Sequence, residues 1–430
     1  MEETNMDDNE QNRETEAAPA LIAVHPTQES VAVAVGSDLR VFNLRGHSVS
    51  LLDESGGNKH KDSIRAIRYG AEGKLFVSAG DDKLVKIWVT DSWRCTHSVL
   101  SEKRVSAVAI SKNGRFVCFA DKFGMVYITD IESSEKQDIP NKKAVPILSH
   151  YCSIITSLEF SPDGRFIISA DRDFKIRVTL FPQNPLNGAH EIQSFCLGHT
   201  EFVTCLAFVC NPDFPQGFLV SGGGDSTIRL WDYACGSLLD TCHVGSLAGV
   251  AESNGGEEDI IPAVTDLCAT PDGSLVAVAI QSLPGVMLLS CDLSTKSLSV
   301  FKVVRIDGET FIPTSLGAGA TSAGLLWLVM GVSSLNASES GSLARVRVLS
   351  GFGKTNQGST DQEPSFLEDK DVPGGEAMLQ KLQGDLCIKT EVFLTAAEAV
   401  KTAMRNLLIK KQYSSERREF RKRGRNDKKK

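Results

Sequence analysis

The stretch Ser-Gly-Gly-Gly-Asp-Ser-Thr-Ile-Arg-Leu-Trp at residues 221–231 decides the fold, because the chain repeats it. Residues 78–88, Ser-Ala-Gly-Asp-Asp-Lys-Leu-Val-Lys-Ile-Trp, and residues 169–179, Ser-Ala-Asp-Arg-Asp-Phe-Lys-Ile-Arg-Val-Thr, align with it without a gap. A degenerate copy occupies residues 119–129. Each copy is typical of two short strands joined by a Gly/Asp turn, so the chain is built from repeated β units.

Similar units can be recognised at residues 21–44, 264–293 and 313–349, which brings their number to seven. The strand-like segments before the copies end in Gly or Asn-Gly turns, whose positive backbone angle suits a tight hairpin. A period of roughly 40 to 50 residues that ends in Trp-Asp is typical of a WD-repeat β-propeller. The sequence therefore predicts an all-β, seven-bladed propeller over residues 20–351.

Polar residues recur at fixed places in these units. In the WD-repeat family, which the chain resembles, a His, a Ser, a turn Asp and a Trp of one unit are hydrogen-bonded to one another. The best set here is His199, Ser221, Asp225 and Trp231; the set recurs in part at His60, Ser78, Asp82 and Trp88, and Asp173 holds the same aligned place as Asp82 and Asp225. A hydrolase triad would not be duplicated from repeat to repeat, so we interpret these residues as a structural network.

No motif in the sequence carries catalytic or cofactor chemistry. The eleven cysteines are odd in number and include no Cys-x-x-Cys pair, which argues against a disulfide framework and a zinc cluster and favours an intracellular protein. We therefore predict a non-catalytic chain with no catalytic residues, no cofactor and no metal. The longest apolar run, near residues 324–332, is about half the roughly 18 residues that a membrane helix needs, so no membrane is expected.

Charge is distributed unevenly along the chain. Of the net charge of -8, residues 1–16 carry -6 and residues 401–430 carry +10, which leaves -12 for the body between them. An acidic body disfavours nucleic-acid contact by the propeller as a whole. We predict an acidic disordered segment at residues 1–19, a linker and irregular segment at residues 352–394, and a C-terminal helix with a basic tail at residues 395–430. The apolar face of that helix would dock on the propeller or bind another protein.

The copy at residues 169–179 differs from the others in its charges. Arg172 and Lys175 stand where the aligned copies show that the repeat requires no cation. Arg177 matches a Lys or an Arg in the other two copies, so the repeat also accounts for it, and Thr179 replaces the terminal Trp. This cationic edge is either a solvated surface or a docking patch for a carboxylate of a partner, to which a planar Arg offers two parallel hydrogen bonds.

The stretches Ala-Asp-Arg-Asp-Phe-Lys-Ile-Arg at residues 170–177 and Ser-Phe-Cys-Leu-Gly-His-Thr-Glu-Phe-Val at residues 194–203 resemble one particular family. It is the WD-repeat, non-catalytic subunit of eukaryotic tRNA (guanine-N7-)-methyltransferase. The resemblance implies a nuclear scaffold that forms a heterodimer with a Rossmann-like catalytic subunit, which methylates N7 of a guanine in the tRNA variable loop. It implies that tRNA is met through the complex, and that Arg177 contacts an acidic residue of the catalytic subunit, with Lys175 beside it.

Two other functions stay open at this point. A propeller can serve as the substrate receptor of a ubiquitin ligase, but such receptors often carry Trp-Asp-x-Arg after a blade, and residues 231–234 read Trp-Asp-Tyr-Ala. The basic tail would alternatively bind RNA directly. Salt-dependent binding of tRNA by residues 395–430 alone would support that reading.

Overall fold

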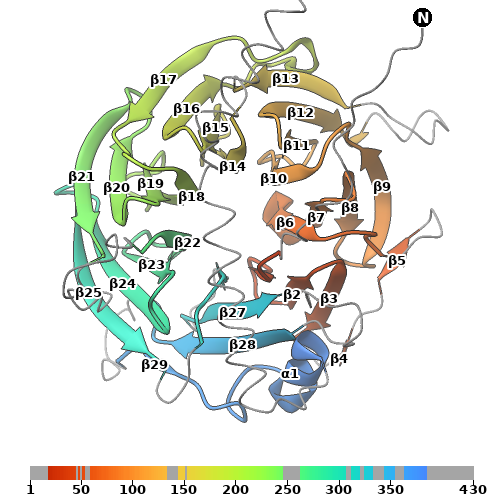
Figure 1. Cartoon of the computed structure of the whole chain (residues 1–430), viewed down its shortest axis with the longest axis vertical. Coiled ribbons are helices and arrows are strands. Elements are labelled where there is room, and N and C mark those ends of the chain that lie inside the picture. Colours follow the sequence, from red (N-terminus) through yellow and green to blue (C-terminus); the bar gives the residue numbers. More distant parts are fainter. Residues whose placement is uncertain are drawn as a thin grey trace, which may run out of the picture.

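The computed structural model describes residues 18–44, 47–48, 51–53, 59–132, 144–150, 153–245, 262–306, 311–319, 324–332, 343–353 and 363–384. Within these residues seven antiparallel sheets surround a central axis (Figure 1). Each sheet is one blade, numbered here in chain order, and its first full strand lies nearest the axis. The predicted seven-bladed propeller is confirmed.

Blades 1 to 3 run in sequence order around the ring. Blade 1 contains β1 Leu21–Val24, β2 Ser30–Val35, β3 Asp38–Asn43 and β4 His47–Ser48. Blade 2 contains β6 Ile64–Gly70, β7 Leu75–Gly80, β8 Leu84–Val89 and β9 Arg94–Leu100, with β5 Leu52–Asp53 added parallel to β9 at its outer edge. Blade 3 contains β10 Val105–Ile110, β11 Phe116–Asp121, β12 Met125–Asp130 and β13 Val145–Ser149.

Blades 4 to 7 complete the ring. Blade 4 contains β14 Ile155–Phe160, β15 Phe166–Asp171, β16 Lys175–Leu180 and β17 Ile192–Leu197. Blade 5 contains β18 Val203–Val209, β19 Phe218–Gly223, β20 Thr227–Asp232 and β21 Ser237–His243. Blade 6 contains β22 Val264–Ala269, β23 Leu275–Ile280, β24 Gly285–Asp292 and β25 Ser297–Arg305. Blade 7 contains β26 Ser315–Ala318, β27 Leu326–Val332, β28 Leu343–Ser350 and β29 Ser365–Phe366.

The core lies between the faces of neighbouring blades. Every residue of β2, β11, β15, β19 and β23 is buried, because the second strand of a blade is covered on both faces by the blades beside it. Ile176 and Val178 of blade 4, for example, pack with Leu206 and Leu219 of blade 5. The turns that lead into these strands need positive φ, and Gly164 supplies it at 73° between β14 and β15.

The ring closes between blades 7 and 1. The amide of Ala20, just before β1, donates to the carbonyl of Gly331 in β27 at 2.9 Å, and the hydroxyl of Thr314 donates to the carbonyl of Ala20 at 2.7 Å. In Figure 1 the helix α1, Gly375–Gln383, lies where β3 and β28 meet. Its apolar side chains pack into one cluster with both blades, namely Met378, Leu379 and Leu382 against Phe42 and Val346.

Residues 363–384 therefore correct the predicted linker at residues 352–394. They contain β29, the outer strand of blade 7, and α1, whose Gln383 Oε1 accepts the amide of Val346 at 2.7 Å. The predicted acidic segment falls almost wholly outside the described residues, and the predicted C-terminal helix and basic tail at residues 395–430 fall entirely outside them. Among the elements that the structure does describe, no helix is long and apolar enough to cross a membrane.

Candidate partner-docking site on the fourth blade

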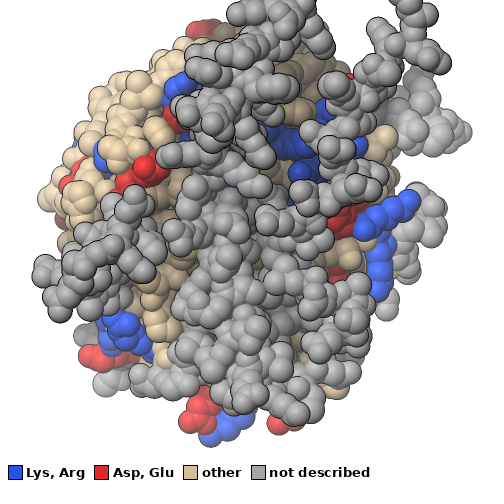
Figure 2. Space-filling view, in the orientation of Figure 1, with Lys and Arg blue, Asp and Glu red and all other residues tan. Residues whose placement is uncertain are grey.

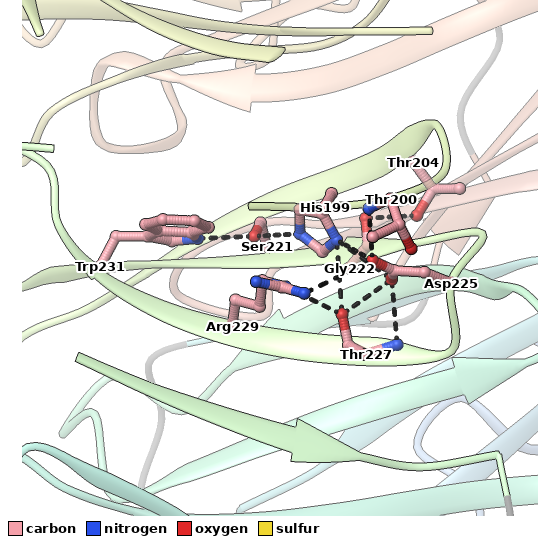
Figure 3. Close-up of polar contacts among 9 residues, drawn as sticks. All are labelled: His199, Thr200, Thr204, Ser221, Gly222, Asp225, Thr227, Arg229 and Trp231. Atoms are coloured by element: carbon pink, nitrogen blue, oxygen red, sulfur yellow. Dashed lines mark hydrogen bonds and ion pairs between the residues drawn. The ribbon is translucent and has the colours of Figure 1, made fainter. Parts of the chain in front are cut away.

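The predicted polar network of blade 5 is brought together around His199 (Figure 3). Its Nε2 lies 2.7 Å from Oγ of Ser221, and its Nδ1 lies 3.0 Å from Oδ2 of Asp225. The indole of Trp231 donates to the same Ser221 oxygen at 2.8 Å. Burial raises the pKa of Asp225, but hydrogen bonds from His199 and Thr227 outweigh it, and the pKa lies well below its usual value. All these polar groups are turned toward one another inside the blade, which is what a structural role requires.

Blade 2 repeats the arrangement with the same four residue types. His60 lies 2.8 Å from Asp82 and 2.9 Å from Ser78, and Trp88 donates to Ser78 at 3.1 Å. The His and Asp side chains are almost fully buried in both blades. In the residues that the structure covers, no group of three or more His, Cys, Asp or Glu side chains is placed to hold a metal ion.

Blade 4 builds its network differently, and this corrects the role predicted for Asp173. His150 lies 2.8 Å from Oδ2 of Asp171 and 2.7 Å from Oγ of Ser169, so Asp171 is the network carboxylate. Asp173 lies in the turn, partly exposed, and its amide donates to Oδ1 of Asp171 at 2.8 Å.

The reason is the last residue of the second strand, which is Gly223 in blade 5 and Asp171 in blade 4. A Cβ on Gly223 would lie 2.8 Å from Nδ1 of His199 and 3.0 Å from Oδ1 of Asp225. A side chain at this position therefore fills the space that the turn carboxylate otherwise uses. In blade 4 the side chain that fills it is itself a carboxylate, so the histidine bonds to it and the turn Asp is not needed.

Arg177 is the predicted docking residue with the most distinctive surroundings. Its half-buried guanidinium donates through Nη1 to the carbonyl of Ser149 in blade 3 at 3.0 Å, and through Nε to Oγ1 of Thr179 at 3.1 Å. Burial lowers its pKa. Within the described residues these two acceptors take only part of its five N–H donors, and no carboxylate lies within ion-pair distance.

The equivalent cations of blades 2 and 5 are engaged inside their own blades. Lys86 is 2% exposed and its ammonium lies 5.9 Å from the ring centre of Trp88. Arg229 donates to Thr227 and lies 3.8 Å from a carboxylate oxygen of Asp225. Among the described residues, the repeat cation of blade 4 has neither an indole nor a carboxylate beside it, because Thr179 stands in place of the Trp and the network carboxylate comes from Asp171 at the end of β15.

Exposed apolar side chains flank this arginine. In the β16 and β17 pair, Arg177 lies opposite Phe195 and Lys175 lies opposite Leu197, and directly opposed residues point to the same face of a sheet. Phe195 is 43% exposed and Leu197 is 61% exposed, although both are large apolar residues. Lys175 is exposed as well. We call these four residues the blade 4 docking patch; it lies at the outer edge of the ring (Figure 1).

Phe195 and Leu197 were not predicted as docking residues, and the predicted residue Arg172 lies in the turn beside the patch. Phe195 and Leu197 belong to an outermost strand, and only the strand pairing shows that they share a face with the cations. Arg172 sits in the turn after β15, where its amide donates to the carbonyl of Ile154 at 3.0 Å. It therefore borders the patch from the β15 to β16 turn.

Comparison with known proteins locates this patch inside a matched region. Residues 129–323 match the family model described as "tRNA methyltransferase TRM82 WD40 domain", and residues 56–89 match "WD domain, G-beta repeat". These matches confirm the resemblance indicated by the sequence stretches of blade 4.

Several relatives carry the name tRNA (guanine-N(7)-)-methyltransferase non-catalytic subunit. The Danio rerio protein is 34% identical over 247 residues, which cover 57% of this chain and 55% of that protein. The Homo sapiens protein is 31% identical, with 57% and 54% covered, and the Xenopus laevis protein is 28% identical, with 73% and 75% covered. The chain thus spans about half the length of the first two relatives. Their shared name supports the prediction that this chain is not an enzyme.

Solved structures show the fold alone. The structure of U3-55K superposes with a TM-score of 0.57 at 17% identity, covering 74% of this chain and 89% of that one. The WD40 repeats of RRP9 superpose equally well, with a TM-score of 0.57.

Proposed function

We propose that this chain is the non-catalytic subunit of a tRNA (guanine-N7-)-methyltransferase, and that it binds and stabilises the catalytic subunit through the blade 4 docking patch. The single observation that carries the docking site is Arg177, a half-buried guanidinium with no carboxylate partner among the described residues. The names of the relatives and the matched region around blade 4 support the function.

The chemistry of the patch suits an acidic segment that carries apolar side chains. A carboxylate of the catalytic subunit accepts from the N–H donors that Arg177 still offers, while Lys175 strengthens the attraction at the exposed rim. Phe195 and Leu197 bury their exposed surface against apolar neighbours of that carboxylate. The half-buried guanidinium is already partly desolvated, so pairing removes little further hydration from it.

Binding of this kind acts on the catalytic subunit without adding a reacting group. A rigid propeller that binds the active conformation more tightly than the inactive one raises the population of the active conformation. tRNA then meets the propeller as part of the complex. The chain itself supplies no catalytic residue, cofactor or metal ligand to the methyl transfer.

We also propose a nuclear location, which the basic run at the C-terminal end of the sequence supports. A tagged chain that lacks residues 412–430 should lose nuclear accumulation, and a fully nuclear truncated chain would count against the role. The comparisons give no support to a ubiquitin-ligase receptor. Direct RNA binding by residues 395–430 concerns a segment outside the described residues.

The experiment that tests the proposed function is reconstitution. The full chain is co-expressed with the catalytic subunit from the same organism, purified by a tag on the propeller, and assayed for methylation of guanine N7 in tRNA. We expect a stable heterodimer that methylates tRNA, whereas the isolated chain transfers no methyl group and binds no S-adenosylmethionine. Failure of the two proteins to co-purify would contradict the function.

A further inference from the structure

Phe123 is a large aromatic residue held in the open at the turn between β11 and β12. The residue is 51% exposed. Two ammonium groups lie over it: Nζ of Lys103 is 5.4 Å from the ring centre and Nζ of Lys122 is 5.5 Å from it. We call Lys103, Lys122 and Phe123 the blade 3 cation–aromatic cluster. Single exposed aromatic rings are common, but a ring with two ammonium groups over it is a defined local arrangement.

The repeat does not require these residue types. At the place of Phe123, blades 2 and 5 have Asp82 and Asp225. The turn of blade 3 is already fixed from the end of β11, where Oδ1 of Asp121 accepts the amides of Phe123 at 2.8 Å and Met125 at 3.0 Å. The side chain of Phe123 therefore takes no part in holding the turn, and the fold leaves its ring at the surface.

The neighbouring turn of blade 4 also carries an exposed aromatic ring and cationic residues. Phe174 is 39% exposed, with a φ of 70°; in sequence Arg172 lies two residues before it and exposed Lys175 directly follows it. The two turns lie at the same end of adjacent blades, because both follow the second strand of a blade. Adjacent blades thus offer two exposed rings and four cations along one edge.

Acidic groups near this edge are few or already engaged. Asp121 and Asp171 are buried, and Asp81 is paired with Arg65 at 2.7 Å. Arg104, next to Lys103 in sequence, also lies 3.9 Å from Asp81, and the exposed acid beside Lys103 in sequence is Glu102. On the face shown in Figure 2, basic and acidic side chains are interspersed along the rim. The blade 3 cation–aromatic cluster is a local group of positive charges. It sits on a body that carries -12 overall.

Unpaired RNA fits this chemistry better than an acidic protein segment does. A base that stacks on the Phe123 ring takes the place of the ammonium groups that lie over it, and these lysines then neutralise the phosphates on either side of that base. An acidic peptide is recognised best by the planar, bidentate fork of arginine, which is what Arg177 offers in the docking patch. The blade 3 cluster instead places two point charges around a stacking surface.

The cluster is also joined to the docking patch. Met125, two residues after Phe123, pairs with Ser149, and the carbonyl of Ser149 accepts the guanidinium of Arg177 at 3.0 Å. A catalytic subunit docked on blade 4 would therefore lie next to the blade 3 cluster.

We propose that Lys103, Lys122 and Phe123 bind an unpaired nucleotide and its flanking phosphates in the tRNA substrate, next to the docked catalytic subunit. The proposal rests on the proposed function. It assigns to the propeller a direct share in binding the substrate, in addition to binding the catalytic subunit.

The test uses the reconstituted heterodimer with full-length chains and an unmodified tRNA transcript. Phe123→Ala should raise KM for tRNA at least about fivefold with kcat little changed, because the lost stacking acts on binding. Phe123→Trp should keep KM near the wild-type value. Lys103→Glu with Lys122→Glu should weaken tRNA binding and make the plot of log affinity against log salt shallower by about 1.4 for two single-strand phosphate contacts.

A matched control is available on another blade. Lys296 also lies over an aromatic ring, 5.6 Å from the centre of Phe218, so Lys296→Glu reverses a similar charge away from the cluster and should leave KM and the salt slope unchanged. Unchanged KM and salt slope in the blade 3 variants would overturn the proposal. Loss of co-purification with the catalytic subunit would overturn it too, because the cluster would then be a protein interface. If the wild-type proteins form no active heterodimer, the proposed function itself fails, and that result is seen before any variant is made.

Discussion

Nδ1 of His150 lies 2.8 Å from Oδ2 of Asp171, so blade 4 takes its network carboxylate from the end of a strand. In blades 2 and 5 the carboxylate comes from the turn two residues later, as with Asp82 and Asp225. The change is coupled to the docking patch. Because the turn acid is no longer in the network, Arg177 has no counterpart of the Asp225 carboxylate that lies 3.8 Å from Arg229 in blade 5.

The first prediction concerns the pairing of His150 with Asp171. Asp171→Ala should lower the free energy of unfolding by about 1–3 kcal/mol, because it leaves buried His150 and the turn amides without an acceptor. Asp173→Ala, in the same turn, should change it by less than about 0.5 kcal/mol, as expected for a surface position. Urea unfolding of the two variants checks this. Equal losses, or a larger loss for Asp173→Ala, would return the network role to the turn residue.

A second prediction concerns pH. The pKa of Asp225 is lower in the folded blade than in the unfolded chain, so its ionised form stabilises the fold above about pH 4, and this contribution is lost as the pH falls through the folded pKa. Asp225→Asn should therefore be less stable than the wild type at pH 7. The difference should shrink as the pH is lowered below about 4. Urea unfolding across this range measures it, and a difference that does not vary with pH would speak against the ionised carboxylate as the source.

The third prediction concerns the helix that closes the ring. Met378→Ala should lower the free energy of unfolding by about 2–5 kcal/mol, because Met378 is fully buried between blades 7 and 1. Gln380→Ala, on the exposed side of α1, is the control and should have little effect. If both variants unfold at the wild-type urea concentration, α1 does not contribute to ring closure.

Most of the ring could be predicted from the sequence because the pattern of strands and turns can be recognised in each blade separately. The four network positions of blade 5 could be read from a second copy in blade 2. The alignment gave the wrong role to Asp173 because it compared positions along the repeat. In the structure, the network carboxylate is the one that lies beside the histidine, and in blade 4 this is Asp171. The useful signal was Asp171 itself, which stands where the other two aligned copies have Gly.

The closing segment was missed for a different reason. The composition around α1 is that of a linker, because Gly374, Gly375 and Gly384 lie at the helix ends. The strand before it, β29, is only two residues long and gives no recognisable strand pattern. The signal that indicates a packed helix is the four-residue spacing of Met378 and Leu382, which places both on one helical face. Phe195 and Leu197 could not be assigned to the patch from their own strand, because only the pairing of β16 with β17 shows that they lie opposite Arg177 and Lys175.

The fourth prediction tests the docking patch. Lys175→Glu with Arg177→Glu should abolish binding of the catalytic subunit while leaving the propeller folded. Truncation of one member of a buried charge pair costs about 2–5 kcal/mol, and reversal adds repulsion, so affinity should fall well over tenfold. Arg165→Glu is the control: Arg165 is an exposed cation of the same blade, in the turn at the opposite end of β15, and its reversal should not affect binding. Unfolding curves of the double variant establish that the fold is intact.

The measurement that bears most directly on the docking site is charge complementation. Acidic residues of the catalytic subunit are changed to Lys one at a time, and each variant is assayed for binding to the double Glu variant of the propeller by co-purification and titration. One such change should restore binding and tRNA methylation with the double variant and weaken binding to the wild-type propeller. If the double variant instead co-purifies with the unmodified catalytic subunit at wild-type yield, Lys175 and Arg177 are only a solvated edge of blade 4.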